Sequence, residues 1–524
     1  MPNDVETIKA KIFRYNPAVD EEPKIEEYEV PHFDKMKVLD VLKYVQENID
    51  PTLSFRYECE IWRCGSCAVC VDGTSRPACK TPVDKEEIKI EPLSSYKIIK
   101  DLVVDFDEPR DEVAEAYPEI KSDVDISKPI NIHESEIVEK YLEPSRCIEC
   151  WSCQDACPSR EESKIAFRGP AVFHSIGENA YHPLNKNGIT ATREIAVNSG
   201  VWNCVYCLEC LEVCPANISG ANVIENIRRN GFIERGDVPT EVKESLTSTF
   251  SLGNPWQEPR GKRNKWTEEI QEDLKIKRAS KDTDTLLWVG CTPAYDNRCQ
   301  NLAKSVAMIL HESEVDFGTL GNDENCCGAS ARELGEEGLF QELKSKNKET
   351  IEKVNPSRII TISPHCYNYL KNNYNIDSRI LHFTEFLNET IKDKKISFEN
   401  VSKSEEVTIT YHDPCNLGRR NSIYEPARNV LNSIPSFNLV EMPRTRENSY
   451  CCGGGGGNMW IDREFEEERM SENRIKEARN VGAEIVVTSC PFCVINLEDA
   501  VKTLGLEDDL KIKDLSEIIA DSLV

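Results

Sequence analysis

The sequence predicts a multidomain protein of mixed α+β and α/β class. Its 524 residues exceed the roughly 150 of a typical domain, so three or four domains are expected. Its 23 cysteines fall into separate groups along the chain. Its C-terminal half contains two similar segments in which strands alternate with helices, a pattern typical of α/β domains.

Charge and hydropathy exclude several classes of function. Lys and Arg number 64 and Asp and Glu number 92, so the net charge is −28. Such an acidic chain lacks the basic stripe that nucleic-acid binding needs, and anionic lipid repels it. No apolar run approaches the ~20 residues that span a bilayer, and residues 1–15 carry no signal-peptide pattern. We therefore expect a cytoplasmic protein that binds no nucleic acid and has no membrane span.

The first cysteine group lies in the first predicted domain, 1–105. Two strand-like stretches, 7–15 and 25–30, and a helical stretch, 37–48, precede it. The motif CEIWRCGSCAVCVDGTSRPAC has the C-x4-C-x2-C spacing of plant-type [2Fe–2S] sites, with the ligands Cys59, Cys64, Cys67 and Cys79. A zinc ribbon, which would use two CxxC pairs, is the alternative. Cys70 lies outside the spacing, and we expect it to be a buried small residue.

The second domain, 106–240, contains two complete C-x2-C-x2-C-x3-C-P runs. An acidic stretch with prolines, 106–130, precedes them and is predicted to be an extended connector. In two-cluster ferredoxins the fourth cysteine of each run serves the other cluster. We therefore expect one [4Fe–4S] cluster on Cys147, Cys150, Cys153 and Cys214, and a second on Cys204, Cys207, Cys210 and Cys157. Zinc in both runs is the alternative.

A repeat follows a polar segment, 241–284, that is predicted to be an interdomain linker. The period is about 125 residues. TLLWVGC (285–291) matches VTITYHDPC (407–415), ENCCGAS (324–330) matches SYCCGGG (449–455), and RIITISPHCYN (358–368) matches EIVVTSCPFCVIN (484–496). Helical patterns at 301–313 and 465–480 separate the strands. We expect two α/β domains, 285–400 and 401–524, that face one another across a substrate cleft.

The two copies differ in their cysteines. The second copy has five: Cys415, Cys451, Cys452, Cys490 and Cys493. Five are one more than a cubane needs, and a distorted cluster with a bridging thiolate could use all five; structural zinc is the alternative. The first copy has four, because Ser363 replaces the residue equivalent to Cys490: Cys291, Cys326, Cys327 and Cys366. A further [4Fe–4S] cluster or a zinc ion is expected there, with His365 as an alternative ligand and Cys299 as a structural residue.

The N-terminal part resembles the iron–sulfur subunit of succinate dehydrogenase and fumarate reductase. The resemblance covers 5–235 and rests on the [2Fe–2S] loop, YKIIKDLVVD (96–105), and two four-cysteine runs separated by GPAVF (169–173). It implies a β-grasp [2Fe–2S] ferredoxin domain, an α-helical bis-[4Fe–4S] domain and a flavoprotein partner with FAD. That family commonly has a [3Fe–4S] cluster farthest from flavin. The second run here is complete, which argues against a quinone terminus.

The C-terminal part, 285–520, resembles the CCG domains of heterodisulfide reductase catalytic subunits. Those domains hold a noncubane [4Fe–4S] cluster and cleave or form the disulfide of coenzyme M and coenzyme B. The resemblance implies that the five cysteines of the second copy are catalytic. No G-x-G-x-x-G loop follows a strand, so flavin is expected in a separate subunit.

The whole chain resembles the iron–sulfur subunits of thiol:fumarate reductases of methanogenic archaea. This implies that coenzyme M and coenzyme B thiols are oxidised to the heterodisulfide at the C-terminal cluster. Electrons would then pass through the other clusters to a flavoprotein that reduces fumarate to succinate. One alternative is a heterodisulfide reductase subunit that receives electrons from another partner, such as an F420-linked flavoprotein. The other is a pure electron-transfer subunit like those of glycolate or lactate oxidation.

Anionic coenzymes need basic partners in this acidic chain. The candidates near Cys415 and Cys451 are Arg419, Arg420, Arg444 and Arg446, with solvated surface arginines as the alternative. His412, in YHDPC, is a candidate proton donor or acceptor at the sulfurs, or a group that supports the cluster. The GGGGG run, 453–457, lacks the GK[ST] ending of a phosphate loop and indicates a close approach of backbone to cluster or substrate.

Overall fold

The computed structural model describes residues 7–118, 120, 135–185, 187–274, 276–398, 406–463 and 468–523. The chain divides into two compact units, Met1–Val201 with Leu208–Gly231, and Trp202–Cys207 with Phe232–Val524. The segment 202–207 therefore packs with the C-terminal unit, although it contains the first two cysteines of the second cysteine run, Cys204 and Cys207. The predicted boundary at 400/401 lies outside the described residues. The same is true of 121–130, the last part of the acidic stretch that was predicted to be a connector.

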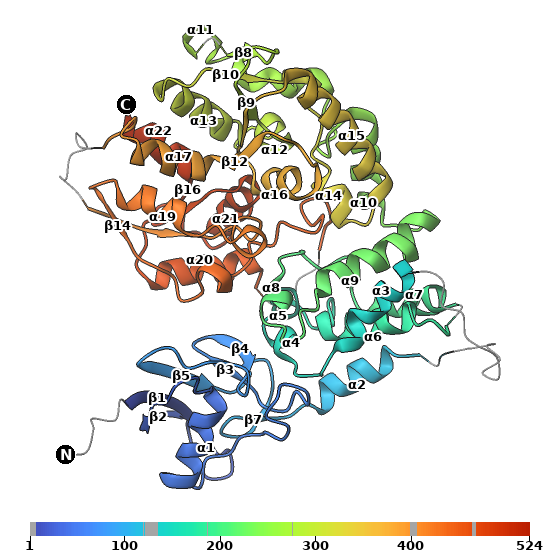
Figure 1. The fold of residues 1–524 in the computed structure, drawn as a ribbon, viewed down its shortest axis with the longest axis vertical. Coiled ribbons are helices and arrows are strands. Elements are labelled where there is room, and N and C mark those ends of the chain that lie inside the picture. Colours follow the sequence, from blue (N-terminus) through green and yellow to red (C-terminus); the bar gives the residue numbers. More distant parts are fainter. Residues whose placement is uncertain are drawn as a thin grey trace. The chain divides into compact units, whose positions relative to one another are not determined.

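A five-stranded β-grasp sheet begins the first unit (Figure 1, blue). Its strands, in the order β2-β1-β5-β3-β4, are β1 (Thr7–Arg14), β2 (Lys24–Pro31), β3 (Ala68–Val71), β4 (Thr74–Pro77) and β5 (Glu87–Glu91). Buried and less buried residues alternate along β1, so one face of the sheet is apolar. Helix α1 (Val38–Asn48) contributes Val38, Leu42 and Val45 to the same core. The strands and the helix predicted in this domain are confirmed.

Short helices build the rest of the first unit. After the hairpin of β6 (Ile98–Lys100) and β7 (Val103–Val104) come α2 (Asp107–Glu115), α3 (Ser135–Leu142), α4 (Ser152–Asp155), α5 (Pro158–Glu162), α6 (Pro170–Ala180), α7 (Gly188–Asn198), α8 (Glu209–Glu212) and α9 (Gly220–Ile227). Helix α2 lies in the acidic stretch that was expected to be extended. Asp107 and Glu108 stand in its first turn, where negative charge favours a helix, so the acidic composition stabilises the helix start.

Two parallel sheets of the same topology form most of the second unit. Lobe 1 (277–398) has the order β12-β11-β9-β10-β8, with β8 (Lys277–Arg278), β9 (Thr285–Trp288), β10 (Phe317–Thr319), β11 (Arg358–Thr361) and β12 (Arg379–His382). Lobe 2 (406–523) has the order β14-β13-β15-β16, with β13 (Val407–Tyr411), β14 (Phe437–Leu439), β15 (Ile485–Thr488) and β16 (Lys511–Asp514). Read in the opposite direction, the lobe 2 order is β16-β15-β13-β14, which corresponds strand for strand to β12-β11-β9-β10 of lobe 1. The sequence repeat is therefore also a repeat of the fold, with β8 as an additional strand in lobe 1.

Helices connect these parallel strands, as crossover connections require, and a further helix follows the last strand of each lobe. In lobe 1 they are α12 (Cys291–Tyr295), α13 (Gln300–Glu312), α14 (Ala329–Glu333), α15 (Glu337–Val354), α16 (Pro364–Asn373) and α17 (Phe383–Lys392). In lobe 2 they are α18 (Gly418–Asn421), α19 (Glu425–Asn432), α20 (Met470–Asn480), α21 (Pro491–Thr503) and α22 (Leu515–Leu523). Among the described helices, none is long and apolar enough to cross a bilayer.

The two lobes share one apolar core. Leu287 of β9 belongs to a cluster that also contains Ile409 and Leu515 of lobe 2. Leu286 and Trp288 belong to a different cluster, so both faces of the lobe 1 sheet are buried. Such burial on both faces explains the continuous apolar runs that mark these strands in the sequence.

The segment predicted to be a linker, 241–284, is largely folded. It forms most of α10 (Thr240–Leu252), the 3-10 helix η4 (Arg260–Thr267), α11 (Gln271–Leu274) and β8, which pairs with β10. Trp266 is 2% exposed and joins the apolar core that the two lobes share, and Arg263 is 3% exposed. Polar composition suggested a solvated segment, but a few side chains of η4 turn inward and anchor it to lobe 1.

Candidate metal centres and thiol site

The first cysteine group forms a tight loop whose backbone points at sulfur. The N–H groups of Arg63 and Cys64 donate to Cys59 Sγ at 3.2 and 3.3 Å. The N–H group of Trp62 donates to Cys79 Sγ at 3.3 Å. Several N–H donors on cysteine sulfur stabilise the negative charge of a bound cluster. The loop therefore fits a [2Fe–2S] cluster.

This loop lies directly against the first cysteine run of the same unit. Gly65 has a φ of +69°, and a Cβ atom there would overlap the carbonyl oxygen of Ile148. The nitrogen of Cys150 would lie 3.0 Å from that Cβ atom. Only glycine permits this approach, which brings two cysteine groups into contact. Cys70 lies instead on β3, where burial raises the pKa of its thiol to about 12.

Three thiols of the first run lie with the last thiol of the second run. Burial and the neighbouring thiols Cys147, Cys150 and Cys214 raise the pKa of Cys153 well above its ordinary value. Burial, Cys150 and Cys214 likewise raise the pKa of Cys147 to about 12. This grouping fits one [4Fe–4S] cluster with crossed ligands. The other predicted set is divided between the two units, and its cluster stays a prediction: Cys157, Cys204, Cys207 and Cys210.

Five thiols of lobe 2 converge where the two central strands, β13 and β15, end. Cys415 follows β13, and Cys490 and Cys493 stand at the start of α21. Cys451 contacts both Cys415 and Cys452. The Sγ atoms of Cys452 and Cys493 are 3.3 Å apart, and Cys493 contacts Cys490. The contacts join all five sulfurs, which fits a cluster with more than four thiolate ligands.

The Cys490 thiol is stabilised as a thiolate. Burial raises its pKa, but hydrogen bonds with Cys493 and His365 outweigh burial and lower the pKa to about 5. A thiolate is the form that binds iron and attacks disulfides. Cys490 is therefore suited to either role at neutral pH.

Four thiols meet at the equivalent place in lobe 1: Cys291, Cys326, Cys327 and Cys366. Ser363 caps α16 in extended backbone conformation, as Cys490 caps α21. In each lobe the glycine after the cysteine pair has positive φ and donates its N–H to the first cysteine, Gly328 at 3.4 Å and Gly453 at 3.3 Å. Lobe 1 thus keeps the geometry of lobe 2 but has a hydroxyl in place of the fifth thiol. Its donor set fits a [4Fe–4S] cluster or zinc.

The folded segment before lobe 1 adds a positive charge to the lobe 1 site. Arg263 Nη1 lies 3.6 Å from Cys291 Sγ, and Arg263 also forms an ion pair with Glu324, which is 2% exposed. Glu324 accepts the N–H groups of Val289 and Gly290 at 3.0 and 2.8 Å. A fixed guanidinium beside a thiolate stabilises it. Sequence reasoning missed Arg263 because it lies in the predicted linker.

His412 lies beside two thiols of the lobe 2 site. Single ligand atoms of His412, Cys452 and Cys493 lie within 4.8 Å of one another. Arg474, which is fully buried, donates from Nε to His412 Nδ1 at 3.1 Å. Because a guanidinium only donates, Nδ1 is the acceptor, and the neutral ring carries its proton on Nε2. The ring contacts Cys452 and helps to lower the pKa of that thiol, after Cys451 and Cys493, which favours a supporting role over metal ligation.

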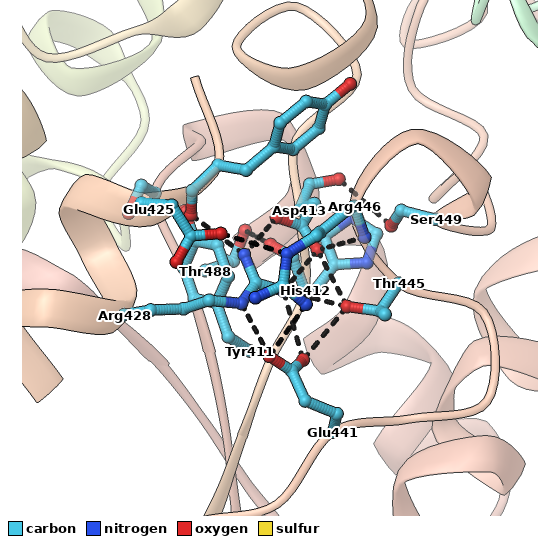
Figure 2. A network of polar contacts seen from close by, with 12 residues as sticks. Tyr411, His412, Asp413, Glu425, Arg428, Glu441, Thr445, Arg446, Ser449 and Thr488 are labelled. Carbon is cyan, nitrogen blue, oxygen red and sulfur yellow. Dashed lines mark hydrogen bonds and ion pairs between the residues drawn. The ribbon is translucent and has the colours of Figure 1, made fainter. Parts of the chain in front are cut away.

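A network of polar side chains anchors the loop that holds His412 (Figure 2). Arg428 pairs with Asp413 at 2.7 and 2.8 Å and with Glu441 at 2.6 Å. The Thr445 hydroxyl donates to Glu441 at 2.9 Å, and the Arg446 N–H donates to Asp413 at 2.9 Å. Burial raises the pKa of Asp413, but Arg428 outweighs it and lowers that pKa. The network fixes the loop after β13 to the segment before the cysteine pair.

Two of the four arginines predicted to bind anions are paired with carboxylates. Arg444 Nε donates to Glu477 at 2.5 Å, and Arg446 Nε donates to Glu425 at 2.9 Å. An arginine that is neutralised by a neighbour attracts an anion weakly. These two residues therefore contribute to the structure around the site.

The other two predicted arginines fasten segment 202–207 to lobe 2. Arg419 Nε donates to the carbonyl oxygen of Cys207 at 2.7 Å, and Arg420 Nη2 donates to that of Tyr206 at 3.2 Å. The Arg420 guanidinium lies 4.5 Å from the centre of the Tyr206 ring. Its Nε is buried and has no hydrogen-bond partner among the described residues. Arg420 therefore keeps an unused donor near Cys415.

The glycine run packs against the same segment. A Cβ atom at Gly456, whose φ is +65°, would overlap the carbonyl oxygen of Cys204. Asn458 Nδ2 donates to that oxygen at 3.1 Å. Cys207 and Cys451 contact each other in one apolar cluster. The glycines thus serve a close approach of two cysteine groups.

Comparisons with known proteins agree with this arrangement. Three family profiles match the chain: a 2Fe-2S iron-sulfur cluster binding domain at 9–111, a 4Fe-4S dicluster domain at 139–215, and a cysteine-rich domain at 285–371 and 409–498. A subunit of the dihydromethanophenazine:CoB--CoM heterodisulfide reductase of Methanosarcina acetivorans is 30% identical over 73% of this chain and 95% of its own length. The chain belongs to this family of iron–sulfur proteins.

One other family member matches a larger part of this chain, and another is longer than this chain. A subunit of the fumarate reductase (CoM/CoB) of Methanothermobacter marburgensis is 29% identical over 98% of each chain. The probable iron-sulfur-binding oxidoreductase FadF of Bacillus subtilis is 31% identical over 78% of this chain and 63% of its own length. The chain thus spans about three fifths of the length of that relative. The predicted fold class and the fusion of ferredoxin-type with CCG domains are confirmed.

Proposed function

We propose that the chain is the iron–sulfur subunit of a thiol-driven fumarate reductase. Coenzyme M and coenzyme B thiols are oxidised to their heterodisulfide in lobe 2, and a flavoprotein subunit uses the electrons to reduce fumarate. The contact of Cys207 with Cys451 carries this proposal, because it joins a ferredoxin-type cysteine run to the thiol site. The likeness to a fumarate reductase (CoM/CoB) subunit over 98% of both chains supports it.

The two half-reactions balance. Two thiols lose two protons and two electrons as one S–S bond forms, and fumarate takes up two protons and two electrons to give succinate. Iron–sulfur clusters on the cysteine groups would supply one-electron transfer between these reactions. The lobe 2 donor set fits such a group because five thiols meet there.

Residues around the thiol site support substrate binding and thiolate chemistry. The unused Nε donor of Arg420 is suited to the sulfonate of coenzyme M or the phosphate of coenzyme B. Contacts with Cys451, Cys493 and His412 lower the pKa of the Cys452 thiol well below its ordinary value, so that sulfur is anionic. Arg428 and Asp413 hold the loop in place, so these groups are preorganised before substrate arrives.

The [2Fe–2S] loop supports docking of a flavoprotein. Ile61 and Trp62 stand between two cysteines of this loop and are 63% and 40% exposed. Exposed apolar side chains beside a redox group are typical of a protein interface. We infer that the flavoprotein covers this face.

The decisive experiment assays the native complex under anaerobic conditions. Fumarate reduction with benzyl viologen, thiol-dependent fumarate reduction and heterodisulfide reduction are measured separately. We expect all three activities and a co-purifying flavoprotein. If the complex turned over neither the thiols nor the heterodisulfide, the proposal would be refuted. The chain would then be an electron-transfer subunit like those of glycolate or lactate oxidation.

A second candidate is a heterodisulfide reductase subunit that runs the same thiol chemistry in reverse. The 30% identity over 95% of the Methanosarcina acetivorans heterodisulfide reductase chain favours it. The partner separates the two candidates. A partner like the succinate dehydrogenase flavoprotein supports fumarate reduction, whereas another redox partner, such as an F420-linked flavoprotein, supports disulfide reduction.

A further inference from the structure

His365 of lobe 1 reaches the thiol site of lobe 2. It is 7% exposed and contacts Cys490. Its ring centre lies 4.8 Å from that of Phe492, in the turn between Cys490 and Cys493. The next residue, Cys366, contacts Cys327 in the lobe 1 site. Two consecutive residues of α16 therefore contact different cysteine sites.

Groups from both lobes hold the His365 ring in place. Asn416, which follows Cys415 in lobe 2, has its Nδ2 atom 3.3 Å from His365 Nδ1. Glu333 of lobe 1 has an oxygen 3.9 Å from the same nitrogen. Its other oxygen accepts the N–H of Gly456 in the glycine run at 2.8 Å. The ring cannot turn away from the thiol without breaking contacts across the lobe boundary.

The repeat itself provides the reason to assign His365 a role. Ser363-Pro-His-Cys in lobe 1 aligns with Cys490-Pro-Phe-Cys in lobe 2, so Phe492 is the counterpart of His365. Lobe 2 has a thiol at the first position and receives a histidine from lobe 1. Lobe 1 has a hydroxyl at that position, and the counterpart from lobe 2 is an apolar ring. Lobe 2 thus combines a thiol with a histidine that can donate a proton, whereas lobe 1 combines a hydroxyl with an apolar ring that cannot.

We propose that His365 is a positioning residue through which lobe 1 raises the reduction potential of the lobe 2 centre, by hydrogen-bonding Cys490. Reduction adds negative charge to the sulfurs, and an N–H donor stabilises the more negative state more strongly. The effect is large in a buried site because water does not screen it. This inference rests on the proposed function only in requiring an iron–sulfur cluster in lobe 2, whatever the substrate.

The test compares two substitutions in the full chain, both purified anaerobically. His365→Phe copies the Phe492 side and removes the donor, whereas His365→Gln keeps an amide N–H. Iron content is measured first, and the lobe 2 signal is then followed by EPR during reductive titration without thiol. We expect full iron content in both variants. In His365→Phe the equilibrium constant for reduction of the lobe 2 centre should fall about tenfold or more, which lowers its reduction potential by ~59 mV for a one-electron couple. The fall in His365→Gln should be smaller.

His311→Phe, at an exposed histidine on α13 of the same lobe, is the matched control and should leave the potential unchanged. An unchanged potential in His365→Phe with full iron content would overturn the proposal. Loss of lobe 2 iron in both His365 variants would also overturn it, because His365 would then be a ligand or a packing residue. A wild-type complex without thiol turnover refutes the proposed function but leaves the shift in potential measurable.

Discussion

At the residue scale, one sulfur atom distinguishes the two cysteine-rich sites. Cys490 and Ser363 occupy equivalent caps at the starts of α21 and α16. Cys490→Ser gives lobe 2 the donor set of lobe 1, so we expect thiol and heterodisulfide turnover to fall at least ~100-fold. The EPR signals of the ferredoxin-type clusters should persist, because their cysteines lie elsewhere. Turnover equal to wild type would contradict the assignment, and Ser363→Ala should leave thiol turnover intact.

A buried carboxyl group at the end of β16 makes stability depend on pH. Burial raises the pKa of Asp514 to about 8, and its Oδ2 has no hydrogen-bond partner among the described residues. The folded carboxyl keeps its proton up to about pH 8, whereas the unfolded carboxyl releases it near pH 4. The folded state therefore holds the extra proton between these values, and the free energy of unfolding falls as pH rises through this window.

Asp514→Asn should reduce this pH dependence. The carboxyl contributes a slope of about 1.4 kcal/mol per pH unit, which the uncharged amide lacks. Anaerobic thermal unfolding between pH 5 and pH 8 should show a smaller decline of Tm in the variant than in the wild type. Parallel Tm curves for the two proteins would mean that Asp514 ionises normally in the folded state.

At the element scale, the glycines of the run 453–457 are needed because there is no room for a Cβ atom, more than because glycine is flexible. Gly456→Ala should lower Tm strongly and weaken the packing of 202–207, because its Cβ atom would overlap the Cys204 carbonyl group. Gly482 is the matched control, since its φ is +74° and nothing lies within 4 Å of an added Cβ atom. Gly482→Ala should cost only about 1 kcal/mol of backbone strain. Equal Tm losses in the two variants would show that close packing is unimportant.

The 3-10 helix η4 offers a second matched pair. Arg263→Gln leaves Glu324 buried without its cation, and we expect a loss of about 3–5 kcal/mol in the free energy of unfolding. The preceding residue, Lys262, pairs with Glu258 at the surface, with side chains 55% and 37% exposed. Lys262→Gln should cost less than about 1 kcal/mol. Denaturant titration measures both, and similar losses would exclude a specific role of Arg263.

At the scale of the whole molecule, local spacing predicted the fold and the cysteine groups, whereas long-range contacts could not be predicted. The strands β1, β2, β9, β11, β13 and β15 followed from periodicity, and the ligand runs from short loops that must present several thiols at once. Helix α2 and the folded segment 241–284 were not predicted. The Arg474 contact with His412 joins residues 62 apart, and Arg263 lies 61 residues from Glu324. No local pattern encodes such pairs. The unused donor of Arg420 and the pairing of Arg444 likewise became visible only with the packed structure.

The first cysteine group and the thiol site belong to different units, which predicts that electron delivery can be lost without loss of thiol chemistry. Cys59 lies in the first unit, whereas the lobe 2 thiols and their apolar surroundings belong to the second. In Cys59→Ser, heterodisulfide reduction with benzyl viologen should stay within about twofold of wild type, because the substitution leaves the lobe 2 thiols and their surroundings unchanged. Thiol-dependent fumarate reduction should fall at least ~100-fold, since the [2Fe–2S] site loses a ligand.

Cys70→Ser is the control for this variant, because Cys70 lies on β3 of the same domain outside the predicted ligand set. It should retain both activities and the [2Fe–2S] signal in EPR. Thiol-dependent fumarate reduction that survived Cys59→Ser would mean that electrons reach flavin without the first cysteine group. The flavoprotein would then have to dock elsewhere on the chain, and Ile61 and Trp62 would not mark its interface.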